Sequence, residues 1–241
     1  MKAAILIPCL TEHMYPGSGL SMVKVLRHAG VDVEYVNDQT CCGQPAFNAG
    51  YRDEIIPIAE RLIGLFKGKD YVIAPSGSCT AMVRVFYREL DIDGALRDDL
   101  DDLCGRIFEF CEFMVDVAKV DSLGGRFPHK VTYHDSCHLS RELGVVAQPR
   151  KLISDIAEID FVEMTDSDAC CGFGGMFSAK FPELSVEMVA RKCANIVESG
   201  AEFVIGADAG CLMNIGGYLR KNRLAPETMH IADLLAQSLD L

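Results

Sequence analysis

Short runs of apolar residues alternate along this chain with longer stretches whose apolar positions recur at helical spacing. Residues 3–8 are apolar without alternation, which predicts a strand buried on both faces of a parallel sheet. Residues 18–29 place Val23 and Leu26 on one face and stop at Gly30, so we predict a helix there. The same criteria predict further strands over 31–36, 70–74, 106–110, 130–134, 159–164, 202–206 and 227–231, and further helices over 50–67, 80–90, 111–120, 149–157, 182–199, 212–221 and 232–239.

Predicted strands and helices alternate in the same order in both halves of the chain. Such alternation is typical of α/β folds, in which right-handed crossovers place parallel strands in one sheet. Residues 122–129 contain two adjacent glycines and a proline, which predicts a linker. We therefore predict an α/β fold of two similar repeats, residues 1–125 and 126–241, each with a small, mainly parallel sheet flanked by helices.

An unusual cysteine motif follows the same repeat. A Cys-Cys-Gly doublet begins at Cys41 and again at Cys170. In each half another cysteine lies ahead of the doublet, with 31 or 32 residues between, and a further one lies behind it, with 36 or 39 residues between. Eight of the eleven cysteines therefore form two matching sets. The first set is Cys9, Cys41, Cys42 and Cys79, and the second set is Cys137, Cys170, Cys171 and Cys211.

Each cysteine of these sets comes directly after a predicted strand or after the turn that follows it. In open parallel sheets, binding sites form outside the carboxyl ends of the strands. We therefore expect the cysteines of each half to converge at one edge of a sheet, although they are far apart in the sequence. The doublet glycines, Gly43 and Gly172, suit a backbone that turns sharply or passes close to a cluster.

Four thiolates at one point bind either zinc or an iron–sulfur cluster. The side chains of adjacent cysteines diverge in extended backbone, so they do not easily bind one tetrahedral ion. A multinuclear cluster accepts both, and the doublets therefore favour iron–sulfur chemistry over zinc. Cys104, Cys111 and Cys193 lie outside the repeat, and we interpret them as core residues.

Polar residues near the cysteines are candidates for supporting roles. His134 and His138 flank Cys137, where they can hydrogen-bond to a cluster sulfur, serve as ligands, shuttle protons or be ordinary structural histidines. His230 falls at the end of a predicted strand and can approach the second set. Asp208 is a candidate oxygen ligand.

Composition and charge restrict the partners and the location. The formal net charge of −12 disfavours nucleic acid and anionic membranes as partners. No apolar run approaches the ~20 residues of a membrane span and the amino-terminal run lacks signal-peptide features, so we predict a cytoplasmic protein without membrane insertion. Thiols stay reduced in the cytosol, which favours metal binding or redox chemistry over structural disulfides.

Other charged and glycine-containing patterns are less specific. Arg141 and Arg150 either attract an anionic substrate or lie on solvated helix faces. The acidic run over residues 98–102 is either a solvated helix face or a docking patch. The chain has no G-x-G-x-x-G after a strand and no G-x-x-x-x-G-K-[ST], so we propose neither a dinucleotide site nor a nucleoside triphosphate site.

The cysteine motifs carry a resemblance to a known family. The double C…CCG…C pattern resembles the duplicated cysteine-rich (CCG) domain family over nearly the whole chain, through Gln39-Thr-Cys-Cys-Gly-Gln-Pro-Ala-Phe-Asn48, His134-Asp-Ser-Cys-His138 and Cys170-Cys-Gly-Phe-Gly-Gly175. That family includes the cysteine-rich component of heterodisulfide reductase and the glycolate oxidase iron–sulfur subunit, and this chain is most similar to its lactate-utilisation branch. The resemblance implies an iron–sulfur electron-transfer subunit, with [4Fe–4S] as the favoured cluster. It also implies other iron–sulfur subunits as partners, in a complex that oxidises L-lactate or a similar 2-hydroxy acid to the keto acid.

One departure from the family pattern keeps other functions open. The fullest pattern ends each repeat in C-x-x-C, but here the first position of that motif is Ser76 in one half and Asp208 in the other. The loss of this cysteine is compatible with four-cysteine clusters, with a site that has an oxygen ligand, and with zinc in one site. The alternatives are a thiol–disulfide redox enzyme like heterodisulfide reductase and a non-catalytic scaffold stabilised by zinc. We assign no catalytic residue.

Overall fold

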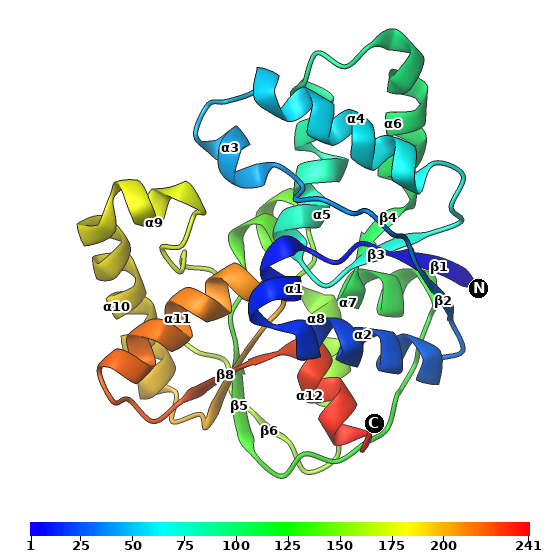
Figure 1. Ribbon diagram of the computed structural model, residues 1–241. Coiled ribbons are helices and arrows are strands. Elements are labelled where there is room, and N and C mark those ends of the chain that lie inside the picture. Colours follow the sequence, from blue (N-terminus) through cyan, green and yellow to red (C-terminus); the bar gives the residue numbers. More distant parts are fainter.

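Two parallel four-stranded sheets with the same strand order form the framework of the protein (Figure 1). The computed structural model describes residues 1–241, apart from the side chain of Ala95. The orders are β2-β1-β3-β4 and β6-β5-β7-β8, which confirms the predicted fold class. The strands are β1 (Lys2–Ile5), β2 (Asp32–Tyr35), β3 (Val72–Ala74), β4 (Ile107–Glu109), β5 (Lys130–Tyr133), β6 (Asp160–Phe161), β7 (Phe203–Gly206) and β8 (Glu227–His230).

The strand registers of the two sheets correspond residue by residue. Lys2 pairs with Asp32 between β1 and β2, and Lys130 pairs with Asp160 between β5 and β6. Both residues of the second pair lie the same number of positions after their counterparts in the first pair. The paired strand residues of one half therefore have identifiable counterparts in the other half.

Alternate residues of each strand enter different apolar cores. In β1, Ala3 and Ile5 join a central core that also contains Val131 and Tyr133 of β5. Ala4 instead joins an outer core of the first half. Side chains of a strand point alternately to its two faces, so each sheet is covered on both sides. The central core is common to both halves, and each half has an outer core of its own.

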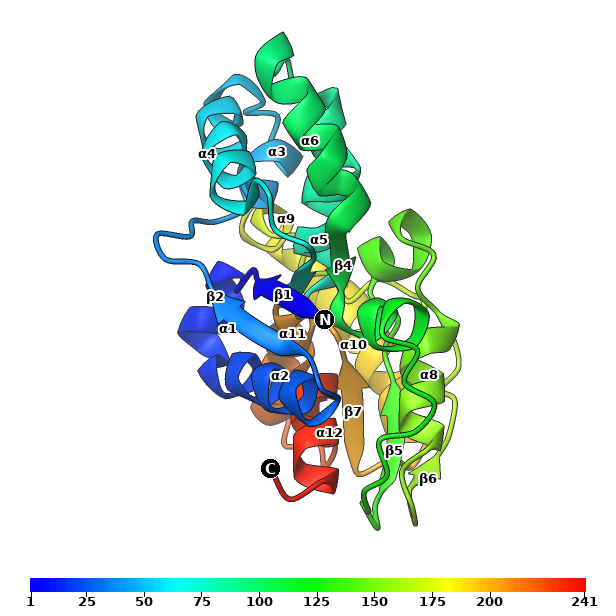
Figure 2. The same ribbon diagram turned by 90° about the vertical axis from the view of Figure 1, so that its right-hand side faces the viewer.

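Helices cover the outer faces and also cross between the halves. The carboxyl-terminal helix α12 packs against α2, far from it in sequence (Figures 1 and 2). The α-helices are α1 (Cys9–Met14), α2 (Pro16–His28), α3 (Gln44–Asn48), α4 (Ile56–Phe66), α5 (Gly77–Arg84), α6 (Gly94–Arg106), α7 (Phe110–Glu112), α8 (Ala147–Ser154), α9 (Met176–Lys180), α10 (Pro182–Glu198), α11 (Ala209–Lys221) and α12 (Ile231–Ser238). Short 3-10 helices η1 (Asp53–Ile55) and η2 (Phe86–Glu89) and π-helices η3 (Phe113–Val117) and η4 (His138–Glu142) complete the elements.

Helices α1, α3 and α9 were not predicted from the sequence. Each has only five or six residues, which is too short for an apolar period to be recognised. All three lie beside the cysteine segments, and α1 begins at Cys9 itself. The acidic run belongs to α6, where Asp99 pairs with Lys67 and Asp102 with Arg106. That arrangement agrees with a solvated helix face.

The predicted linker is tied down by backbone hydrogen bonds. Arg126 N–H donates to the carbonyl of Ser238 at 2.8 Å, and Ala157 N–H donates to that of Gly125 at 3.0 Å. A Cβ on Gly125 would meet the Ser238 carbonyl oxygen at 2.8 Å. The boundary between residues 125 and 126 stays a prediction. Across the described chain, no helix has the length and apolar character needed to cross a bilayer.

Glu109 is a fully buried carboxyl group at the end of β4. Its Oε2 accepts hydrogen bonds from the N–H groups of Cys111 and Glu112 and so caps α7, while its Oε1 has no partner among the described residues. Burial raises the pKa of Glu109 from 4.5 to about 8, because desolvation penalises the charged form. Between pH 4.5 and about 8, the folded protein therefore keeps a proton on Glu109 that the unfolded chain has released.

This proton predicts a pH-dependent stability difference between the wild type and Glu109→Gln. Glutamine keeps an acceptor for the cap but cannot ionise. The free energy of unfolding of the wild type should fall relative to that of Glu109→Gln as pH rises from 5 to 8, by at most about 1.4 kcal/mol per pH unit. Urea unfolding of the reduced, metal-free proteins measures this difference. A difference that does not change with pH would contradict the assignment.

Candidate metal centre

All eight cysteines of the two predicted sets line one cavity with a volume of about 310 Å³. They reach it from the segments that follow β1, β2 and β3 in one half and β5, β6 and β7 in the other. This is the convergence at the carboxyl ends of the strands that the sequence predicted. The sequence did not predict that both sets would face a common cavity. The residues are Cys9, Cys41, Cys42, Cys79, Cys137, Cys170, Cys171 and Cys211.

The first set contains two close pairs of sulfur atoms. The Sγ atoms of Cys9 and Cys41 lie 3.6 Å apart, and those of Cys42 and Cys79 lie 3.2 Å apart. The N–H of Gly43 donates to the Cys41 sulfur at 3.4 Å. Cys9 begins α1, and Cys79 lies in the first turn of α5.

The second set repeats this arrangement. The Sγ atoms of Cys171 and Cys211 lie 3.0 Å apart, and the Cys137 thiol hydrogen-bonds to Cys170. The N–H of Gly172 donates to the Cys170 sulfur at 3.4 Å. Cys211 lies in the first turn of α11, as Cys79 does in α5. Both sets therefore present paired sulfur donors in the same pattern.

Hydrogen bonds divide the thiols of each set into proton donors and acceptors. The pKa of Cys41 is lowered to about 2 because the thiols of Cys42 and Cys9 donate to its sulfur. The pKa of Cys170 is lowered to about 2 by the equivalent thiols of the second set. Metal ligation requires thiolates, so each set contains one sulfur that is already prepared to bind a cation.

The doublet backbone is fixed in both halves by glycine and by a side-chain hydrogen bond. Gly43 and Gly172 have φ values of 83° and 80°, a region that other residues rarely adopt. The Cys42 carbonyl accepts a hydrogen bond from Tyr87 Oη at 2.9 Å, and the Cys171 carbonyl accepts one from Asn214 Nδ2 at 2.8 Å. Sequence reasoning missed Tyr87 and Asn214, because the two halves use different residue types on different elements.

Asp208 joins the two halves at the edge of the cavity. Its carboxylate accepts hydrogen bonds from Ser76 Oγ at 2.8 Å and Ser78 Oγ at 2.6 Å in the first half, and from Ser136 Oγ at 2.6 Å in the second half. Asp208 is buried, so these donors compensate the cost of desolvating its charge. The residue predicted as a candidate ligand therefore has both oxygen atoms engaged by serine hydroxyls.

Two of the three candidate histidines have hydrogen-bond partners across the halves. The Nδ1 atom of His138 lies 2.8 Å from Gln44 Nε2 of the first half. His230 accepts from the N–H of Ala232 at 3.1 Å, and its Nε2 lies 3.2 Å from the Pro75 carbonyl oxygen. Burial lowers the pKa of His230, so this side chain is a neutral structural residue at neutral pH.

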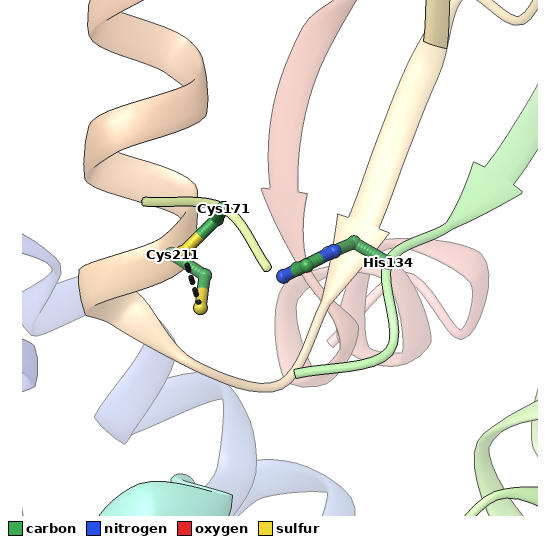
Figure 3. Close-up of side chains that lie close together, drawn as sticks. All are labelled: His134, Cys171 and Cys211. Carbon is green, nitrogen blue, oxygen red and sulfur yellow. Dashed lines mark hydrogen bonds between the residues drawn. The ribbon is translucent and has the colours of Figure 1, made fainter. Parts of the chain in front are cut away.

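His134 is different, because its buried ring has no nitrogen or oxygen partner among the described residues. Its ring nitrogen and the sulfur atoms of Cys171 and Cys211 all lie within 4.8 Å of one another (Figure 3). The pKa of Cys211 is lowered to about 7, mainly by its hydrogen bond with Cys171 and in addition by His134. The structure thus places His134 next to the second set.

The remaining candidates lie away from the cysteine cavity. Arg150 forms a bidentate pair with Asp135, at 2.7 and 2.9 Å, and also pairs with Glu163. Arg141 donates to the carbonyl of Asp168 at 3.1 Å. The three cysteines outside the repeat are buried in the apolar cores, as predicted: Cys104, Cys111 and Cys193.

These observations define a class of protein: an α/β protein built of two cysteine-rich repeats whose sulfur donors suit a metal centre. The chain belongs to the cysteine-rich (CCG) domain family, which matches residues 3–84 and 131–216. This membership confirms the resemblance inferred from the cysteine motifs.

Comparison with known proteins agrees with this family. The chain is 43% identical over 236 residues to lactate utilization protein A of Exiguobacterium sp., covering 97% of this chain and 96% of that protein. It is 41% identical over 235 residues to lactate utilization protein A of Oceanobacillus iheyensis, covering 98% and 96%. A crystal structure of a hypothetical protein from Helicobacter pylori shares the fold, with a TM-score of 0.68 at 11% identity, and the match covers all of this chain and 49% of that chain.

The tight backbone at Gly172 predicts a specific loss of stability in Gly172→Ala. A Cβ there would meet the Ser185 carbonyl oxygen at 2.7 Å, whereas a Cβ on Gly124 would meet nothing within 4 Å. Both glycines have positive φ, so alanine at either position costs about 1–2 kcal/mol in backbone strain. The clash should make Gly172→Ala less stable than Gly124→Ala by a further ~1–3 kcal/mol. Urea unfolding compares them, and equal losses would contradict this account of the loop.

Proposed function

We propose that this chain is an iron–sulfur electron-transfer subunit of a multi-subunit complex that oxidises L-lactate, or a similar 2-hydroxy acid, to the keto acid. The observation that carries the proposal is the arrangement of two matching sets of four cysteines around one cavity. The names of the relatives supply the substrate class, since lactate utilization protein A covers this chain almost end to end.

The donor set supports an iron–sulfur group in each half. The thiols of each set form two close pairs joined by a Cys-Cys doublet, which suits several iron atoms better than one tetrahedral ion. Backbone N–H groups of Gly43 and Gly172 point at cysteine sulfur atoms, and such hydrogen bonds raise the reduction potential of a cluster. When bound, the clusters would accept and pass on single electrons. Zinc remains the alternative metal for these thiolates.

The task of the chain's own residues is to hold and orient this group. Oxidation of a hydroxy acid removes two electrons and two protons from carbon and oxygen, which usually requires a flavin or nicotinamide as hydride acceptor. The sequence carries no phosphate-binding glycine motif for either cofactor. A relay role therefore fits better than a role in the first chemical step, and other iron–sulfur subunits are the proposed partners.

The common cavity gives one specific reason to keep a second candidate function. Besides the eight cysteines, the cavity is lined by apolar residues such as Leu10, Phe173 and Met176. A small sulfur-containing molecule could approach both sets there. This feature favours a thiol–disulfide redox enzyme like heterodisulfide reductase as the alternative.

The relay role predicts that lactate oxidation depends on partner subunits. The anaerobically reconstituted chain alone should give no lactate-dependent dye reduction, and co-expressed partners should restore it. In the restored complex, Cys171→Ser should abolish the activity because it removes a ligand. Cys193→Ser should retain it, because Cys193 lies in the apolar core of the second half. Robust turnover by the isolated chain would contradict the relay role and make this the catalytic subunit.

A further inference from the structure

His134 occupies the same backbone position in the second half that Leu6 occupies in the first. Leu6 N–H donates to the Ile73 carbonyl at 2.9 Å, and His134 N–H donates to the Ile205 carbonyl at 2.8 Å. Ile73 pairs with Ile5 and Ile205 pairs with Tyr133 in the equivalent strand registers. Leu6 and His134 are both 1% exposed. The two halves thus differ at this buried position in chemistry and not in geometry.

The surroundings of the two side chains also correspond. Leu6 packs in the outer core of the first half together with Cys42 and Cys79. The ring of His134 points toward Cys171 and Cys211, which are the counterparts of those cysteines (Figure 3). The nitrogen and the two sulfur atoms all lie within 4.8 Å of one another. A metal atom bound by these sulfurs in the second half would have an imidazole beside it, whereas in the first half it would have a leucine.

An apolar residue would serve at this position if only packing mattered, as Leu6 demonstrates. Burying a polar group without a hydrogen bond costs about 1–3 kcal/mol. The ring nitrogens of His134 have no nitrogen or oxygen partner within the described structure, and the polar group that the ring faces is the sulfur of Cys211. His138 and His230 are both engaged in hydrogen bonds. A group bound at the second set would compensate this cost. Imidazole and thiolate are ligands that iron and zinc both accept together.

We infer that His134 is a ligand of the metal centre of the second set, which makes the two sets chemically unequal. The inference rests on the proposed function in that it requires both sets to hold metal. The second set keeps its four cysteines, so His134 adds a nitrogen donor to them, whereas Leu6 adds none to the first set.

The test is pulsed electron paramagnetic resonance of the full chain, reconstituted anaerobically with iron and sulfide and then reduced. The wild type should show the strong nitrogen coupling of a directly bound imidazole, and this signal should change isotope pattern when histidine is labelled with ¹⁵N. The wild-type measurement decides whether any histidine is a ligand, and this result does not depend on whether a variant folds. An iron–sulfur protein without strong nitrogen coupling would overturn the inference while leaving the proposed function intact.

Variants identify the histidine. His134→Leu reproduces the residue of the first half and should lose the nitrogen coupling. His138→Leu is the matched control, adjacent to Cys137 but bonded to Gln44, and it should keep the coupling. Persistence of the coupling in His134→Leu would overturn the assignment.

A chain that takes up no iron–sulfur group contradicts the proposed function instead. In that case X-ray absorption of the zinc-loaded chain tests the ligand. Nitrogen among the zinc ligands of the wild type that is lost in His134→Leu supports the assignment, and an all-sulfur shell overturns it.

Discussion

The constraint on which this structure depends is the close approach of buried and half-buried cysteine sulfur atoms. The sulfur pairs lie 3.0 to 3.6 Å apart in both halves, and like charges at such distances inside a protein repel strongly. The thiols therefore share protons when no cation is present: hydrogen bonds lower the pKa of Cys41 and of Cys170 and raise the pKa of Cys42 and of Cys171. A positively charged centre would replace those protons.

The two sheets hold the sulfur atoms in this position. Parallel strands bring residues that are far apart in sequence to one edge, and the central core joins the two edges around a common cavity. Asp208 then connects the halves at the rim through Ser76, Ser78 and Ser136.

Much of this could be predicted from the sequence, because its signals are local and repeated. The apolar runs predicted the strands, and the doubled cysteine motif predicted both sets of candidate ligands. The common cavity was not predictable, since it depends on how α12 packs on α2 and on side chains of both halves that meet in the central core. The hydroxyl partners of Asp208 and the position of the His134 ring beside Cys171 and Cys211 were also missed, because no spacing rule reports which groups a buried side chain contacts.

The repeat also explains where the halves are free to differ. The glycines and cysteines of the doublets are the same in both, because the backbone and the sulfur donors depend on them. The residues around them differ between the halves. Apolar Leu6 of the first half corresponds to His134 of the second half, and uncharged Ser76 corresponds to acidic Asp208. A duplicated fold of this kind can keep two similar sulfur sets and still surround them with different side chains.

Metal and sulfide analysis of anaerobically purified protein tests the central claim most directly. Iron, acid-labile sulfide and zinc are quantified per chain in the same preparation. The account predicts bound iron and sulfide in comparable amounts, with little zinc. Stoichiometric zinc without sulfide would contradict it and show that the eight cysteines serve to stabilise a scaffold.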